Sequence, residues 1–112
     1  WGDGSPYREF LYAKDVARTC IQLLESQIEL PRRLIVSGQE EIQIKDLVQL
    51  VCDAYDYHNI KWLTDKPNGQ LRRPTNKEAF NNVLPDFAYT DLRQAMKNTV
   101  MWFEQNYPKV RI

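Results

Sequence analysis

Two short glycine-containing loops each carry an arginine that could bind an anion. The first loop reads Trp1-Gly2-Asp3-Gly4-Ser5-Pro6-Tyr7-Arg8, and the second reads Gly69-Gln70-Leu71-Arg72-Arg73-Pro74. A guanidinium group is planar and permanently charged, and it can hold two phosphate oxygens at once. Two such groups that converge from separate loops would form a clamp for a diphosphate. The chemistry that the sequence suggests first is therefore anion binding.

The second loop has two adjacent arginines, of which only one can face a given ligand. In a strand-like segment neighbouring side chains point to opposite sides, so Arg72 and Arg73 are expected to separate. Lys66 adds a third cation close by in the sequence. The alternative is a solvated loop whose arginines pair with acidic side chains.

The aromatic residues of the first loop could complete such a site. Trp1 and Tyr7 can offer a ring face beside Arg8, and stacking of a base on such a face is worth about 1–3 kcal/mol. The alternative is that Trp1 is a core residue whose partners are missing from this chain, and spacing leaves both readings open. The glycines do not form the dinucleotide-binding fingerprint, because its third glycine position is Tyr7 and a strand is expected to follow.

The overall charge gives no reason to expect a nucleic acid or a membrane surface as a partner. Fifteen basic residues balance fifteen acidic ones in the 112-residue chain, so its formal net charge is zero. A neutral protein has no long-range field that steers it to a polyanion, and no apolar run approaches the length of a membrane-spanning helix. With 43% hydrophobic and 27% charged residues, the composition is that of an ordinary folded domain.

Few residues suggest catalysis or metal binding. Cys20 and Cys52 lack metal-ligand spacing and fall on apolar faces of predicted helices, so we expect reduced core residues and a cytoplasmic protein. His58 is the only histidine, and with no nucleophile or acid at a recognisable spacing it is interpreted as a structural or surface residue. No nucleophilic triad, zinc set or paired-carboxylate pattern stands out.

The spacing of apolar residues predicts one small α/β unit. Helices are expected at 15–27, 44–56, 76–83 and 90–107, with N-caps at Asp15, Gln43, Asn76 and Thr90 in that order. Short strands are expected at 8–12, 34–36 and 60–64, and a turn is expected at 65–69. Because the chain starts on Trp inside a loop, we also expect it to be part of a longer protein.

Several motifs, in this order, resemble the extended short-chain dehydrogenase/reductase family that acts on nucleotide sugars. They are Trp1-Gly2-x-Gly4-x-Pro6-x-Arg8-Glu9-Phe10, then Asp15, Gly69-Gln70 followed by two basic residues, Leu84-Pro85-Asp86-Phe87, and Trp102-Phe103-x-x-Asn106-Tyr107. The Arg-Glu-Phe segment is common to the superfamily. The Trp-Gly start, the Gly-Gln-basic-basic segment and the Leu-Pro-Asp-Phe run narrow the resemblance to members that epimerise and reduce a GDP-linked keto sugar.

The resemblance implies that residues 1–112 are the small C-terminal substrate-binding domain of such an enzyme. Trp1, Arg8 and Arg73 match its substrate-contacting positions, with Arg73 where the family usually has lysine, so a guanidinium fork replaces a point charge. Many relatives have an acidic residue shortly after the second basic position, where this chain has Asn76. The resemblance therefore does not decide whether this position contacts the ribose. The catalytic serine, tyrosine and lysine, the proton-moving cysteine and histidine, and the NADP-binding Rossmann domain would all precede Trp1.

The sequence leaves three functions open. The first is the GDP-sugar-binding part of an NADP-dependent epimerase and reductase, which is expected to be a homodimer at full length and inactive as this fragment alone. The second is another epimerase or dehydratase of the superfamily, acting on a UDP- or dTDP-sugar. The third is a catalytically silent binding module of the same fold, since a fold is retained more readily than its chemistry.

Overall fold

A two-stranded antiparallel sheet joins the N-terminal loop to the middle of the chain. In the computed structural model, which describes residues 1–110, β1 (Tyr7–Glu9) pairs with β2 (Glu41–Gln43). The register places Arg8 opposite Ile42 and Glu9 opposite Glu41. Arg8 and Glu9 thus lie next to each other on the strand that follows the first loop.

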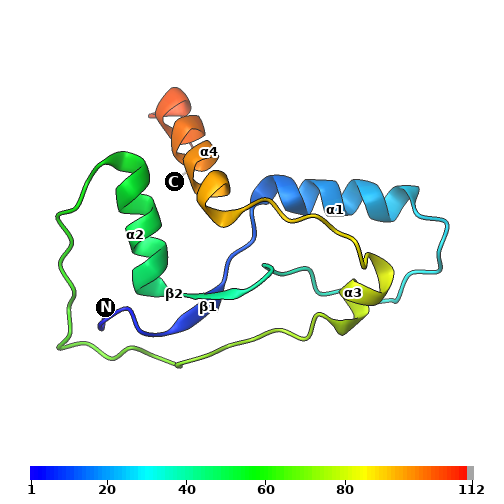
Figure 1. The fold of residues 1–112 in the computed structure, drawn as a ribbon, viewed down its shortest axis with the longest axis horizontal. Helices are drawn as coiled ribbons and strands as arrows, with labels where there is room; N and C mark the ends of the chain where they lie inside the picture. Colours follow the sequence, from blue (N-terminus) through cyan, green and yellow to red (C-terminus); the bar gives the residue numbers. More distant parts are fainter. Residues whose placement is uncertain (111–112) are drawn as a thin grey trace.

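Four helices accompany the sheet in residues 1–110, as the apolar spacing predicts (Figure 1). They are α1 (Ala13–Glu25), α2 (Ile44–Tyr55), α3 (Glu78–Val83) and α4 (Leu92–Asn106). Helix α2 follows β2 directly and packs against α4. The predicted α/β class with short strands is confirmed. No helix among residues 1–110 is long and apolar enough to cross a membrane.

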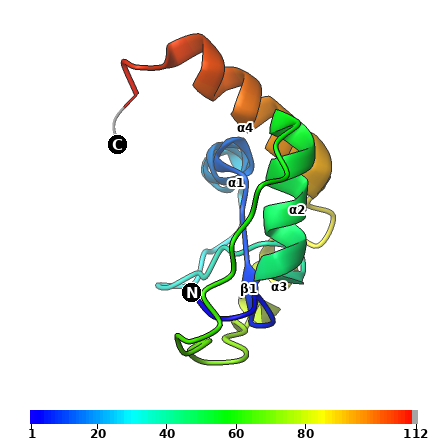
Figure 2. The ribbon, with the colours of Figure 1, turned by 90° about the vertical axis from the view of Figure 1, so that its left-hand side faces the viewer.

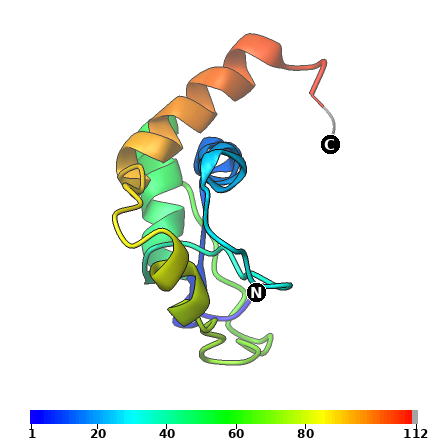
Figure 3. The same cartoon turned by 90° about the vertical axis from the view of Figure 1, so that its right-hand side faces the viewer.

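The molecule is open rather than closely packed. Its Cα radius of gyration is 16.6 Å and its extents are 49 × 34 × 23 Å, whereas a compact chain of this length has a radius near ~13 Å. Figures 2 and 3, from opposite sides, show α1 end-on inside an arc formed by α2 and α4. The accessible surface of 8811 Å² exceeds the roughly 6,500 Å² of a compact monomer of this mass.

The buried core is small and partly aromatic. Phe80 of α3 is fully buried, and its ring meets that of Phe87 edge-on with centroids 5.6 Å apart. The Phe87 ring in turn meets Tyr89, 4.9 Å away. Such edge-to-face pairs add about 0.5–1.5 kcal/mol each beyond the area they bury. This cluster fixes the segment that leads from α3 to α4.

Two of the three predicted strands are wrong. Residues 34–36 and 60–64 form no strand, and β2 lies at Glu41–Gln43 instead. Alternating residues predict a strand at 60–64, but among residues 1–110 this segment pairs with no strand. Its backbone hydrogen bond to a distant segment runs from the Gly2 amide to the Leu63 carbonyl, and its others are local. A strand requires a partner, and β1 pairs with β2.

Of the four predicted N-caps only Gln43 is confirmed in position, although its side chain makes no capping hydrogen bond to α2. Helix α1 begins at Ala13, so Asp15 lies in its first turn, and α4 is capped by Asp91, which accepts a hydrogen bond from the Gln94 amide at 2.9 Å. Asp15 and Thr90 are instead bonded to each other. The N-cap of α3 is Lys77 rather than Asn76, but Asn76 Oδ1 accepts a hydrogen bond from the Glu78 amide at 2.9 Å.

The apolar stripe predicted on 15–27 is present but uncovered in this chain. Cys20 is exposed and is not the core residue that we expected, whereas Cys52 is buried. Ile21 and Leu24 on the same helix are 54% and 86% exposed. Helical periodicity located the stripe, but within residues 1–110 most of its side chains stay exposed.

Candidate functional site

The two arginine loops lie against each other. The Gly2 amide donates to the Leu63 carbonyl at 2.9 Å, and the Asp3 amide donates to Asn68 Oδ1 at 2.8 Å. Further along, the Tyr7 amide donates to the Leu71 carbonyl at 2.8 Å. These bonds hold the chain before Arg8 next to the chain before Arg73. Residues that lie far apart in the sequence thus form one surface.

Arg8 and Arg73 line the same hollow. Its volume is about 480 Å³. Arg8 enters from β1, and its Nη1 donates to the Tyr7 carbonyl, which holds the guanidinium close to the backbone. Arg73 enters from the second loop and forms no ion pair with any residue of 1–110. The remaining lining residues are Glu9, Leu11, Val36, Ser37, Gly38, Pro74 and Thr75.

Arg72 turns to the other side of the second loop. Its Nε donates to Glu41 Oε2 at 3.0 Å, its Nη2 reaches the same oxygen, and its guanidinium lies 5.5 Å from the centre of the Tyr7 ring. Arg72 therefore fastens the loop to β2 and β1. Only Arg73 of the pair lines the hollow, which agrees with the predicted separation of the two side chains.

Trp1 and Lys66 lie outside this hollow. Trp1 is 80% exposed, so the structure does not place it in a core and does not bring it to the two arginines. Lys66 Nζ is 3.4 Å from the carboxylate of its neighbour Asp65. Of the three sequence-derived site residues, the structure thus brings together Arg8 and Arg73, while Trp1 stands apart on the first loop.

A polar network beside the arginines was not found from the sequence. Glu9 Oε2 accepts from the Thr75 hydroxyl at 2.6 Å, and Lys77 Nζ lies 3.3 Å from Glu9 Oε1. The Thr75 hydroxyl also bonds to that of Ser37 at 2.8 Å. Burial raises the pKa of Glu9, but the hydrogen bond from Thr75 and the charge of Lys77 outweigh it and leave the pKa below its usual value. Glu9 is therefore ionised at neutral pH.

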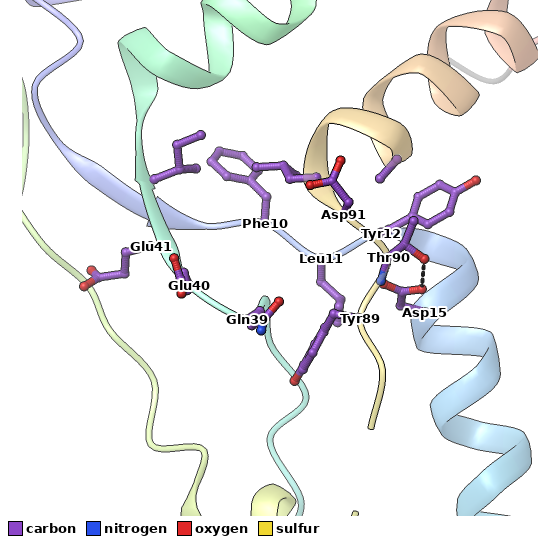
Figure 4. Close-up of a pocket in the computed structure, with 13 residues that line it drawn as sticks. Phe10, Leu11, Tyr12, Asp15, Gln39, Glu40, Glu41, Tyr89, Thr90 and Asp91 are labelled. Carbon is purple, nitrogen blue, oxygen red and sulfur yellow. Dashed lines mark hydrogen bonds between the residues drawn. The ribbon is translucent and has the colours of Figure 1, made fainter. Parts of the chain in front are cut away.

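A second hollow, of about 330 Å³, is lined by carboxylates rather than arginines (Figure 4). Glu40, Glu41 and Asp91 border it, and Asp15 faces Thr90 across one wall. Burial and the nearby charges of Asp15 and Glu9 raise the pKa of Tyr89, which also lines this hollow. A phosphate group would meet repulsion here. The arginine-lined hollow is therefore the better anion site.

Metal chemistry has no support in the described part of the chain. Among residues 1–110 no group of three or more His, Cys, Asp or Glu side chains is placed to hold a metal ion. His58 is exposed and lies 3.6 Å from the Asp56 carboxylate, apart from both hollows described above.

Comparison with known proteins adds a family context. Residues 1–37 match the NAD dependent epimerase/dehydratase family. A GDP-L-fucose synthase of Dictyostelium discoideum is 30% identical over 98% of this chain and 35% of its own length. The crystal structure of a GDP-L-fucose synthetase from Naegleria fowleri bound to NADP superposes with a TM-score of 0.82, at 34% identity over 99% of this chain and 35% of that one.

The chain has the fold of part of an extended short-chain dehydrogenase/reductase. It spans about a third of the length of the relatives it matches. The resemblance to this family, drawn from the sequence motifs, is confirmed, and so is the fold class. A dTDP-4-dehydro-6-deoxy-D-allose reductase from Streptomyces bikiniensis is also similar, at 29% identity over 95% of this chain and 32% of its own length.

Proposed function

We propose that this chain is the nucleotide-sugar-binding part of a GDP-L-fucose synthase. Such an enzyme uses NADPH to epimerise and reduce GDP-4-keto-6-deoxy-D-mannose to GDP-L-fucose. The observation that carries the proposal is the hollow in which Arg8 and Arg73 meet from separate loops. Similarity to GDP-L-fucose synthases over nearly the whole chain supports the choice of substrate.

In this proposal Arg8 and Arg73 bind the diphosphate of the GDP-sugar. Trp1, exposed on the first loop, offers a face on which the base or sugar stacks when the substrate extends beyond the hollow. Two guanidinium groups neutralise the charge of the diphosphate. The domain binds and orients the substrate.

The chemistry is proposed to lie outside these 112 residues. An N-terminal Rossmann domain would hold NADP, which supplies the hydride, and would carry the catalytic groups. The uncovered apolar stripe of α1, with Ile21 and Leu24 exposed, supports a surface that packs against that domain. We further propose a cytoplasmic homodimer. The free thiols of Cys20 and Cys52 are consistent with a reducing compartment.

The test is GDP binding by the intact protein that contains this chain, measured by titration calorimetry. Charge-assisted hydrogen bonds contribute about 1.5–3 kcal/mol each, so Arg8→Ala and Arg73→Ala should each raise the dissociation constant for GDP by roughly tenfold to a hundredfold. Arg32→Ala is the matched control, because Arg32 is exposed and lines neither hollow. Unchanged affinity in both test variants would contradict the proposal.

A second candidate keeps the fold and changes the nucleotide. The similarity to a dTDP-sugar reductase favours it, because a two-arginine site recognises the diphosphate and not the base. Titration of the same protein with GDP, dTDP and UDP separates the candidates. A clear preference for dTDP or UDP over GDP would replace the GDP-L-fucose proposal.

A further inference from the structure

The Glu9 carboxylate joins the three segments that form the arginine-lined hollow. It lies directly after Arg8 on β1, and its two oxygens hold Thr75, two residues beyond Arg73, and Lys77. The Thr75 hydroxyl is also hydrogen-bonded to the Ser37 hydroxyl, so the network extends to Ser37. Lys77 Nζ also donates to the carbonyls of Gly38 and Gln39, at 3.0 and 2.8 Å. One carboxylate thus ties both arginine-bearing segments and the third wall together.

Glu9 is not available as a ligand for the substrate itself. Its side chain is 8% exposed, and each of its oxygens already has a partner within the protein. An ionised carboxylate is also repelled by a phosphate group. Its contribution to an anion site must therefore act through the residues that it holds, chiefly the segment that carries Arg73.

We propose that Glu9 is a positioning residue that sets the separation of Arg8 and Arg73 and so matches the site to a diphosphate. The inference rests on the proposed function, because it assumes that the two arginines bind the nucleotide. A diphosphate spans both guanidinium groups and requires them at a defined spacing. A monophosphate needs only one of them, so its binding depends less on that spacing. Preorganised cations bind more tightly because less ordering is needed on binding.

Positioning and simple electrostatics predict opposite results for Glu9→Gln. Removal of a negative charge next to two arginines raises the local positive potential, and it also frees the charge of Lys77. Electrostatics alone would therefore strengthen the binding of every phosphate. A loss of positioning would weaken the binding of a diphosphate instead. The sign of the change in GDP affinity distinguishes the two effects.

The experiment compares GDP with GMP on the intact protein by titration calorimetry. Glu9→Gln is expected to raise the dissociation constant for GDP about tenfold and that for GMP less than threefold. Thr75→Val removes the same connection without a change in charge, so it should show the same GDP-selective loss even if Glu9→Gln fails to fold. Thr75→Ser keeps the hydroxyl and should bind both ligands like the wild type. Glu40→Gln, an exposed carboxylate outside this hollow, is the charge-matched control.

The outcomes are distinct. GDP-selective weakening in Glu9→Gln or Thr75→Val, with recovery in Thr75→Ser, supports the positioning role. Equal or tighter GDP binding in both variants overturns it, and so does an equal loss for GDP and GMP, which would indicate general disruption. If the wild type binds neither GDP, dTDP nor UDP, the proposed function fails and the positioning role fails with it. If the wild type binds GDP and the variants match it, only the positioning role fails.

Discussion

At Gly2 the first loop passes so close to the second that a side chain has no room. Its φ is +68°, and a Cβ placed there would lie 1.8 Å from Asn68 Oδ1. Gly69 has a similar φ of +74°, but no atom lies within 4 Å of the position that its Cβ would take. Alanine at position 69 would therefore cause backbone strain alone, whereas alanine at position 2 would cause backbone strain and a steric clash. At Gly2 the contact between the loops leaves no space for a Cβ.

This difference predicts unequal effects of the same substitution. Gly69→Ala should cost about 1 kcal/mol of unfolding free energy, because alanine disfavours a positive φ. Gly2→Ala carries the same strain and also pushes Asn68 away, so it should cost more and should weaken GDP binding. Chemical denaturation and GDP titration of both variants measure this. Equal losses in the two variants would show that the loop contact contributes nothing.

The arginines show how far residue-level reasoning extends. Alternation along a strand-like segment predicts that Arg72 and Arg73 separate, and they do. The sequence does not say which of them meets Arg8. That depends on Glu41 of β2, which pairs with Arg72 and leaves Arg73 for the hollow. Glu9 could not be singled out in the sequence, because Thr75 lies 66 residues away from it.

At the scale of elements, one carboxylate connects α1 to the start of α4. Asp15 is 1% exposed, and it accepts from the Thr90 amide at 2.9 Å and the Thr90 hydroxyl at 2.7 Å. Arg18 Nη2 donates to Asp15 Oδ1 at 2.7 Å and to the Ala88 carbonyl at 2.6 Å. Burial of a charge costs free energy unless it is fully hydrogen-bonded. This junction meets that condition, so we expect it to stabilise the fold.

The junction predicts a pH dependence of stability. Burial raises the pKa of Asp15, but the bonds from Thr90 and Arg18 outweigh it and leave the pKa lowered. The unfolded chain therefore binds a proton before the folded chain does. The stabilisation is complete at neutral pH and is lost as the pH falls through and below about 4, the ordinary range of the carboxyl group.

Asp15→Asn should lower the free energy of unfolding at pH 7 and reduce its fall at acidic pH. Urea unfolding of the wild type and the variant at several pH values between 7 and 3 tests this. Asp65→Asn is a control, because Asp65 is exposed and paired only with its neighbour Lys66. The explanation would be wrong if wild type and Asp15→Asn lost stability in parallel as the pH decreased.

At the scale of the whole molecule, the open shape leaves apolar surface without cover. Ile21 and Leu24 of α1 are exposed, and so are Met101 and Trp102 of α4. Large apolar side chains left exposed on two helices are typical of an interface. The 112-residue chain alone should therefore associate with itself in solution.

The α1 face is expected to dominate this association. The double variant Ile21→Gln, Leu24→Gln should shift the isolated chain toward monomer in sedimentation velocity at micromolar concentration, since it removes apolar area at the most exposed stripe. Met101→Gln on α4 is the matched comparison. A shift toward monomer only in Met101→Gln would assign the association to α4, against the prediction.

The sequence by itself determined the four helices of residues 1–110 and the two arginine loops with their family resemblance, and it came within a few residues of the turn, which lies at 63–66 rather than 65–69. Helical hydrogen bonds join residues four apart, so a local pattern suffices to locate a helix. The tertiary structure decided which segment pairs with β1, how Asp15 and Thr90 are used, and which arginine faces Arg8. Each of these depends on a partner far along the chain. The spacing of residues along a short segment does not reveal such a partner, because long-range contacts depend on which segments lie close together in the folded chain.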